Sequence, residues 1–247
     1  MQSEIIRLGA FRRHRAFCRV LASFSAAMFL FVSAAPAFAG STSVLGGNAE
    51  LTGMARATLD SNGANAAVFS SKSASAVLDW AKFNVGAGQS MTFDGSSTTF
   101  FNLVDGAAGK SQIDGIINGS GNVWVINPAG IAFGAGSSVN VGGLFAAAAG
   151  NVENAAALRA GTAAMPAFSS LSGDITTDRA STFSAEQVAL MGKTASVAGD
   201  FKGVGSVDVG AAQKLDVVVD DVNGGKISVK VADFLYADNP SVVSAEL

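Results

Sequence analysis

The chain has 247 residues, 16 of them Lys or Arg and 19 Asp or Glu, and its formal net charge is −3. Its one histidine, His14, and its one cysteine, Cys18, both lie in the first 39 residues, which we expect to be removed. Without them, Ser-His-Asp and Cys-His catalysis, Cys/His zinc sites and disulfides are excluded. The first 39 residues also hold five of the basic groups and one of the acidic groups, leaving 11 and 18 and a net charge of −7. A chain this acidic, with no basic run, is a poor partner for nucleic acid.

Residues 1–39 have the pattern of a secretory signal peptide. Five arginines make the start basic: Arg7, Arg12, Arg13, Arg15 and Arg19. An apolar run from 20 to 35 follows, Pro36 ends it, and Ala37-Phe38-Ala39 is a small-x-small site, so we expect cleavage after Ala39. The alternative is a membrane anchor, but the run is short against the ~20 apolar residues that a span needs.

Residues 40–76 are rich in Gly, Ala, Ser and Asn and contain only short apolar pieces. We expect them to cap the end of the fold, because open strand edges invite aggregation.

Residues 77–145 contain the clearest strands. Between 111 and 143, apolar runs are split by Asn118-Gly119, Gly121-Asn122, Asn127-Pro128 and Gly134–Gly136. Runs rich in Val, Ile and Phe between turn formers indicate strands. The spacings leave no room for a crossover helix, so these strands must meander or wind as a coil.

Residues 146–182 shift to Ala, Ser and Thr, with a predicted short helix at Asn154–Ala160 and a break at Met165-Pro166. We interpret this zone as an excursion. Residues 183–236 return to strands, which we predict at 187–191, 195–198, 203–209, 215–219 and 226–231. Val188, Val197, Val207 and Val217 recur about ten residues apart, which suggests a repeating coil, although a sandwich or barrel also fits.

Three motifs resemble a known family. Val77–Gly86 (VLDWAKFNVG), Ser111–Gly115 (SQIDG) and Asn127–Ile131 (NPAGI) occur in that order. They resemble the secretion module at the N-terminus of filamentous haemagglutinins, the exoproteins of two-partner secretion. The family form of the third motif is NPNGI, and Ala129 replaces its second Asn. The family's other tetrapeptide, NPNL, is absent from this chain.

The resemblance implies an all-β fold: a right-handed parallel β-helix with an N-terminal cap and extra-helical hairpins. On this basis we divide the part after the signal peptide, residues 40–247, into a cap (40–76), a motif-bearing core (77–145), an excursion (146–182) and further rungs (183–236). The resemblance also implies a partner, an outer-membrane β-barrel transporter with periplasmic domains. It further implies release through the periplasm of a Gram-negative envelope to the cell surface or medium. A host or neighbouring-cell surface would be a further partner. The long repetitive body usual in this class is missing, so the chain reads as a short exoprotein, a remnant or a fragment.

Within the third motif, Asn127, Pro128, Ala129, Gly130 and Ile131 are the candidate site residues. They serve either transporter recognition or the setting of the first coil. Asn118, Asn122, Asn127 and Asn140 are either simple turn residues or members of a stacked amide ladder.

Other chemistry has weaker support. Asp216, Asp220 and Asp221 form the one carboxylate group that suggests calcium or a polysaccharide-cleaving enzyme, but adjacent strand residues point to opposite faces, so we expect a solvated turn. Trp80 and Trp124 are core residues or sugar platforms, and Arg159 and Asp174 have no evident partner. We therefore predict no catalytic residue, metal or cofactor. The main alternative to a secretion module is a structural or adhesive surface β-helix exported by another route.

Overall fold

The computed structural model describes residues 40–212, 214–220 and 226–233, and for 214–220 and 226–233 it describes the backbone alone. The predicted signal peptide, with Ala37 and Ala39, and the side chains of Asp216, Asp220 and Asp221 therefore lie outside the described residues. Within the described part of the chain, no helix is long and apolar enough to cross a membrane.

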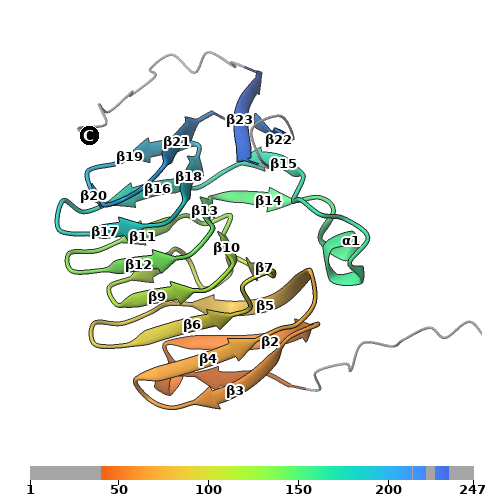
Figure 1. Ribbon diagram of the computed structural model, residues 1–247, viewed down its shortest axis with the longest axis vertical. Helices are drawn as coiled ribbons and strands as arrows, with labels where there is room; N and C mark the ends of the chain where they lie inside the picture. Colours follow the sequence, from red (N-terminus) through yellow and green to blue (C-terminus); the bar gives the residue numbers. More distant parts are fainter. Residues whose placement is uncertain (1–39, 213, 221–225, 234–247) are drawn as a thin grey trace, which may run out of the picture. The chain divides into compact units, whose positions relative to one another are not determined.

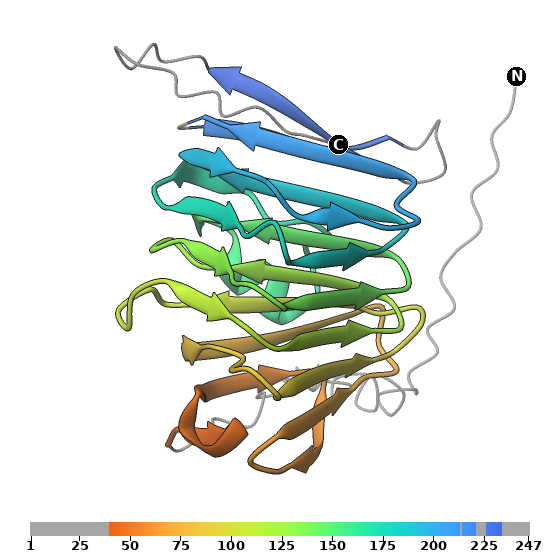
Figure 2. The same cartoon turned by 90° about the vertical axis from the view of Figure 1, so that its left-hand side faces the viewer.

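Short strands follow one another as stacked coils that build three main sheets (Figures 1 and 2). The first sheet runs β1 (Thr42–Val44), β2 (Ala49–Ala55), β5 (Ser75–Phe83), β7 (Thr99–Val104), β10 (Asn122–Ile126), β13 (Leu144–Ala148), β18 (Gln187–Gly192) and β21 (Ser206–Ala211). The second runs β19 (Thr194–Ser196), β16 (Asp174–Thr177), β11 (Ile131–Phe133) and β8 (Ser111–Ile113). The third runs β20 (Asp200–Phe201), β17 (Thr182–Ser184), β12 (Ser138–Val141), β9 (Ile116–Gly119), β6 (Ser90–Asp94), β4 (Ala66–Ser70) and β3 (Thr58–Asn62).

Neighbouring coils pair in parallel, which confirms the predicted parallel β-helix and excludes the sandwich and barrel. Asn118 and Asn140, for example, are 22 residues apart and lie side by side in β9 and β12. The ten-residue spacing of the valines is therefore shorter than one coil. Val188 and Val207 are register partners on successive coils, whereas Val197 lies between β19 and β20.

Alternation along each strand separates two cores. Val123 and Val125 of β10 face the interior of the coil, where they join the main cluster of buried apolar side chains. Trp124 and Ile126 face outward but belong to a second buried cluster. Because Trp80 is 1% and Trp124 0% exposed, neither is available as a sugar platform, and that alternative is wrong.

Aromatic rings fill much of the interior. Phe69 and Phe93 stack with centroids 5.8 Å apart, and Phe183 and Phe201 with centroids 4.9 Å apart. Inside the coil, the Trp80 Nε1–H donates to Asn102 Oδ1 (3.1 Å), and Asn102 Nδ2 donates to the Trp124 carbonyl (2.9 Å). Asn102 is 0% exposed, so these bonds provide the partners that a buried amide requires.

Antiparallel strands cap the N-terminal end of the coils. β1 pairs with β2, β2 pairs with β5, and β3 pairs with β4, all antiparallel, with the 3-10 turn η1 (Leu45–Gly47) between β1 and β2. Gln89 joins this cap to the first coil. Its Nε2 donates to the carbonyls of Leu45 (2.9 Å) and Ala64 (2.7 Å), and its Oε1 accepts from Asn48 Nδ2 (2.7 Å) and the Gly86 N–H (2.8 Å).

An excursion leaves the coils between β13 and β16. It consists of β14 (Gly150–Val152), α1 (Ala155–Ala160) and β15 (Phe168–Leu171), with β14 and β15 paired antiparallel. Asn154, the helix N-cap residue, holds the loop with bonds to the Met165 carbonyl (2.9 Å) and the Ala167 N–H (2.8 Å). The apolar side chains of the excursion, Leu158, Phe168 and Leu171, are part of the outward-facing buried cluster that contains Trp124.

The chain differs from the predicted further coils at its C-terminal end. Over 183–236, coil strands continue to β21, but β22 (Lys214–Asp220) and β23 (Lys226–Asp233) pair with each other in an antiparallel hairpin. Their alternating Val and Ile pattern suits a strand of either kind, so periodicity alone does not distinguish a rung from a hairpin.

Replacing Gln89 with alanine should destabilise the fold, because the Gly86 N–H and the carbonyls of Leu45 and Ala64 lose their partner. We expect the free energy of unfolding in urea to fall by about 2–4 kcal/mol. Gln112→Ala is the matched control, since that side chain is exposed and bonds Asp114, and it should cost less than about 0.5 kcal/mol. Equal losses in the two variants would contradict the role given to Gln89.

Candidate functional site: the stacked motifs

The three sequence motifs lie on consecutive coils and contact one another. Val85, from the first motif, forms a parallel bridge with Ile113 of the second. Ser111–Ile113 then pairs in register with Ile131–Phe133, which begins at the last residue of the third motif. Residues separated by about one coil in the sequence thus form one continuous surface of the fold.

Backbone bonds join the first motif to the second. The amides of Asp114 and Gly115 both donate to the Val85 carbonyl, at 2.7 and 2.9 Å, and Asn84 Oδ1 accepts from the Gln112 N–H at 2.9 Å. Gly115 is required by close approach, since a Cβ there would lie 2.3 Å from the Gly86 carbonyl oxygen. The glycine of SQIDG is therefore explained by packing against the preceding coil.

Asn127 is the centre of the third motif. Its Oδ1 accepts from the Ala129 N–H (2.9 Å) inside the turn, and its Nδ2 donates to the Gly109 carbonyl (3.0 Å) and to Ser111 Oγ (2.9 Å) of the preceding coil. Its backbone N–H donates to the Ala148 carbonyl (3.0 Å) of the following coil. The side chain is 1% exposed, so its polar atoms are committed inside the folded protein.

The rest of the turn is also held by its neighbours. The Pro128 carbonyl accepts from Ser172 Oγ at 2.8 Å. Gly130 has φ +111°, which favours glycine, and a Cβ there would lie 2.9 Å from the Asp174 carbonyl oxygen. Ile131 is fully buried and pairs with Ser111 and Ile175.

Asp174 beside this turn has partners that the sequence did not suggest. Its carboxylate accepts from Thr194 Oγ1 (2.7 Å) and pairs with Lys110 Nζ (3.3 Å). The Thr194 hydroxyl, followed by Lys110 and Lys193, holds the pKa of Asp174 below its ordinary value.

The asparagine candidates play different roles. Asn118 and Asn140 stack on successive coils, with 3.3 Å between Asn140 Nδ2 and Asn118 Oδ1. Asn122 bonds across coils to Thr99 Oγ1 (3.1 Å) and to the Leu144 N–H (2.9 Å). Asn127 combines a turn with bonds across coils.

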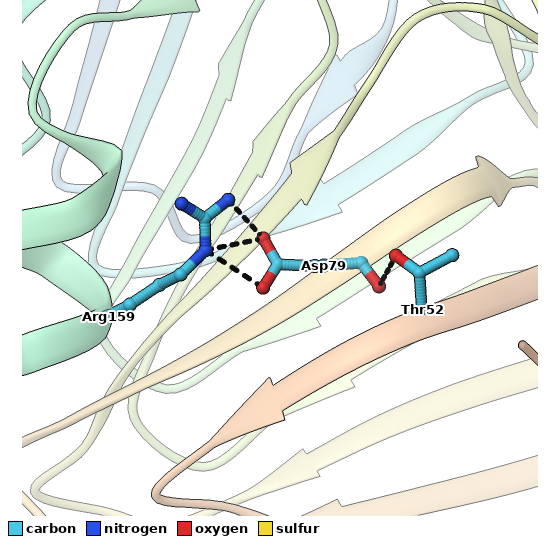
Figure 3. A network of polar contacts seen from close by, with 3 residues as sticks. All are labelled: Thr52, Asp79 and Arg159. Carbon is cyan, nitrogen blue, oxygen red and sulfur yellow. Dashed lines mark hydrogen bonds and ion pairs between the residues drawn. The ribbon is translucent and has the colours of Figure 1, made fainter. Parts of the chain in front are cut away.

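A cleft of about 300 Å³ adjoins two of the motifs. It lies between the excursion and the outer face of the first sheet, and its lining includes Asp79 and Trp80 of the first motif and Pro128 of the third. At its rim the Arg159 guanidinium binds Asp79, with 2.6 Å between Nη2 and Oδ1, and the Asp79 carbonyl accepts from Thr52 Oγ1 (3.1 Å) (Figure 3). The expectation that Arg159 has no partner is therefore wrong.

Sequence reasoning missed Gln89, Asn102 and the Asp79–Arg159 pair. No local pattern signals a contact between residues 80 positions apart. Among the residues that the structure describes, no group of three or more His, Cys, Asp or Glu is placed to hold a metal ion.

Comparison with known proteins places this geometry in a family. The sequence profile of the TPS secretion domain, the two-partner secretion domain, matches residues 57–233. The chain belongs to this family. Its members are modules of exoproteins that leave Gram-negative bacteria across the outer membrane with the help of a partner transporter, and the family is one of secretion domains rather than enzymes.

Two relatives illustrate the likeness. The crystal structure of the HMW1 secretion domain from Haemophilus influenzae has the same fold, with a TM-score of 0.56 and 22% identity over 74% of this chain and 49% of that one. The heme/hemopexin-binding protein of Haemophilus influenzae (strain ATCC 51907 / DSM 11121 / KW20 / Rd) is 35% identical over 72 residues, which are 28% of this chain and 8% of that protein. Both relatives extend well beyond the matched part.

Replacing Asn127 with alanine removes three side-chain hydrogen bonds and leaves the Gly109 carbonyl and the Ala129 N–H without this partner. We expect the free energy of unfolding to fall by about 2–4 kcal/mol. Asn140→Ala, at an exposed position in the Asn ladder, should cost less than about 1 kcal/mol. Urea denaturation of both purified variants measures the difference. Similar losses of the free energy of unfolding in the two variants would contradict the structural importance given to Asn127.

Acid should weaken the fold partly through Asp174. Because its folded pKa is lowered, its contribution is present above the unfolded value of about 3.9 and is lost as the pH falls through the folded pKa. Asp174→Asn should therefore lose less of its thermal stability than the parent between about pH 5 and pH 3. Parallel profiles of Tm against pH for the two proteins would contradict this.

Proposed function

We propose that this chain is the secretion-targeting module of a short or truncated exoprotein, which a partner outer-membrane transporter recognises and which nucleates β-helix folding at the cell surface. The proposal rests most on the burial of Asn127, whose side chain is 1% exposed and bonded within the coils. A folded module would not present this residue to a partner. The third motif must therefore act before folding, by recognition, or during folding, by setting a coil.

Recognition would involve the extended chain. In this proposal the signal peptide is cleaved after Ala39 and the chain remains extended in the periplasm. Periplasmic domains bind extended segments by adding a strand to a sheet edge, with backbone bonds for affinity and alternate side chains for selectivity. Residues 123–126 offer such side chains, and all four are buried once the coils have formed.

Nucleation would follow at the surface. Each new coil buries apolar side chains against the preceding one and pairs its open edge, so that folding proceeds from a formed end. The Asn127 turn is well placed for this, because it bonds to the coil before it through Gly109 and Ser111 and to the coil after it through Ala148. Growth of the stack would favour outward movement without ATP.

The first test is export itself. The chain should appear in the medium or on the cell surface when it is co-expressed with its transporter, and should remain in the periplasm without it. We look for that transporter among neighbouring genes as an outer-membrane β-barrel with two periplasmic domains. Export that is unaffected by removal of the transporter would refute the proposal and favour a surface protein exported by another route.

A second test separates recognition from nucleation. Asn127→Ala should lower the exported amount several-fold relative to Asn140→Ala. Binding of the urea-unfolded chain to the purified periplasmic domains then assigns the step: loss of binding indicates recognition, whereas normal binding with slow refolding indicates nucleation. An Asn127→Ala chain that binds, refolds and is exported normally would leave the motif with neither role.

A further inference from the structure

The excursion is fastened to the N-terminal part of the fold by two arginines. Arg56 lies between β2 and β3 of the cap, and Arg159 lies in α1, 103 positions later. Arg56 reaches forward to the helix, and Arg159 reaches back to Asp79 in β5. We call residues 153–167, which carry α1, the strap.

Arg56 caps the C-terminal end of the helix. Its Nη2 donates to the Leu158 carbonyl at 2.7 Å, and its Nη1 donates to the Arg159 carbonyl. These carbonyls lie in the last turn of α1, at the negative end of the helix dipole, and the Leu158 carbonyl also accepts from the N–H of the C-cap residue Gly161 at 3.0 Å. Gly161, at φ +75°, leaves room for the guanidinium, because a Cβ there would lie 3.3 Å from Arg56 Cζ.

The same guanidinium is anchored on the first sheet. Its Nε donates to the Ser75 carbonyl at 2.8 Å and its Nη2 to Ser75 Oγ at 3.1 Å, at the start of β5. Partial burial lowers the pKa of Arg56. Arg56 also has φ +58°, a conformation that non-glycine residues rarely adopt. Arg56 is thus held, on a strained backbone, in a position where its guanidinium bonds both to β5 and to α1.

The second fastening is the ion pair at the cleft rim. Arg159 Nε lies 3.0 Å from both oxygens of Asp79, and Nη2 lies 2.6 Å from Oδ1 (Figure 3). The pair is partly shielded, with side-chain exposures of 45% for Arg159 and 22% for Asp79, and the carboxylate raises the pKa of Arg159. Gly53 of β2 makes space for the carboxylate, because a Cβ there would lie 3.0 Å from Asp79 Oδ2.

A six-residue helix is too short to be stable alone. The strap therefore depends on contacts with the rest of the fold, and the cap and β5 supply those at its helix end. Once docked, the strap contributes Leu158 to the buried cluster formed by outward side chains of successive coils, among them Val77, Phe101 and Trp124. These coils cannot separate without also exposing that cluster.

We propose that the strap is a lock: it closes only on a correctly formed cap and β5, and it then prevents the N-terminal coils from unravelling one at a time. This proposal concerns the folding of the chain itself and does not depend on recognition by the transporter. It assigns Arg56, Asp79 and Arg159 as positioning residues of the lock.

The test measures opening of the strap in the purified protein. Thermolysin cleaves before bulky apolar residues such as Leu158, so it avoids the trypsin sites that arginine variants remove. Arg56→Ala should speed cleavage in the strap about tenfold or more, because two charge-assisted bonds to the helix end are lost. Arg56→Lys, which keeps the charge and the strained backbone but loses the planar fork, should give an intermediate rate.

Asp79→Asn and Arg159→Ala should each speed cleavage roughly two- to fivefold, and the double variant no more than the larger single effect. Lys202→Ala is the matched control, since it breaks an exposed pair with Asp200 far along the chain, and its rate should equal that of the parent. Strap cleavage at the parent rate in Arg56→Ala and Asp79→Asn would overturn the proposal.

A spectroscopic measurement separates a lock from a simple loss of stability. The chain has two tryptophans, so Trp124→Phe, which keeps an aromatic ring in the outward-facing cluster, leaves Trp80 as a reporter in the first motif and is the background of both proteins compared. With the lock intact, strap cleavage and the Trp80 signal should change at the same urea concentration. In Arg56→Ala, strap cleavage should begin at a lower urea concentration than the change in the Trp80 signal. The region around Trp80 should also unfold faster than in the parent. Coincident transitions with an unchanged unfolding rate would show that the strap locks nothing.

Discussion

Hydrogen bonding from coil to coil is the interaction on which the rest of the structure depends. In the strands, backbone N–H and C=O groups bond to the neighbouring coils through parallel ladders. At the corners of each coil the backbone turns and the ladder is interrupted. Buried polar side chains bridge these corners: Gln89 donates to the Leu45 and Ala64 carbonyls of the cap, and Asn127 donates to the Gly109 carbonyl of the preceding coil. Thr177 Oγ1 accepts from the amides of Ala198 and Gly199 at 2.8 and 3.1 Å. Since unpaired buried groups are costly, these few side chains determine which coils can stack.

The same dependence would suit a chain that crosses the outer membrane before it folds, as proposed for this one. The described residues contain no cysteine, so no covalent bridge holds one coil to another, and each coil gains stability only from its neighbours. An extended chain therefore has almost none of the final stability, whereas a stack gains it coil by coil. The excursion adds a contact between segments that the stacking alone does not link, namely the cap and a helix inserted about 100 residues later.

Local sequence patterns predicted the strands and the helix better than they predicted which strands and side chains contact one another. Strands between turn formers and the short helix at 155–160 follow from composition, and the motifs identified the fold through family resemblance. The valine spacing did not give the coil length, because one coil contains several strands, and alternation did not separate a coil strand from the β22–β23 hairpin. Contacts such as Arg159 with Asp79 have no local signature. Glycines at close approaches, such as Gly53 and Gly115, are the one sequence signal that accompanies such contacts, and a sequence alone does not say what they approach.

The departure of this chain from the family turn can now be interpreted physically. Ala129 stands where the family has a second asparagine, yet the turn is complete, because Ala129 contributes its backbone N–H to Asn127 Oδ1. The bonds that reach neighbouring coils come from Asn127 and from backbone groups of the turn, not from the side chain at 129. The proposed role in coil formation would therefore be preserved in NPAGI. A role that required the second amide, such as a direct contact with a transporter, would be lost, so the substitution favours nucleation over recognition as the work of this turn.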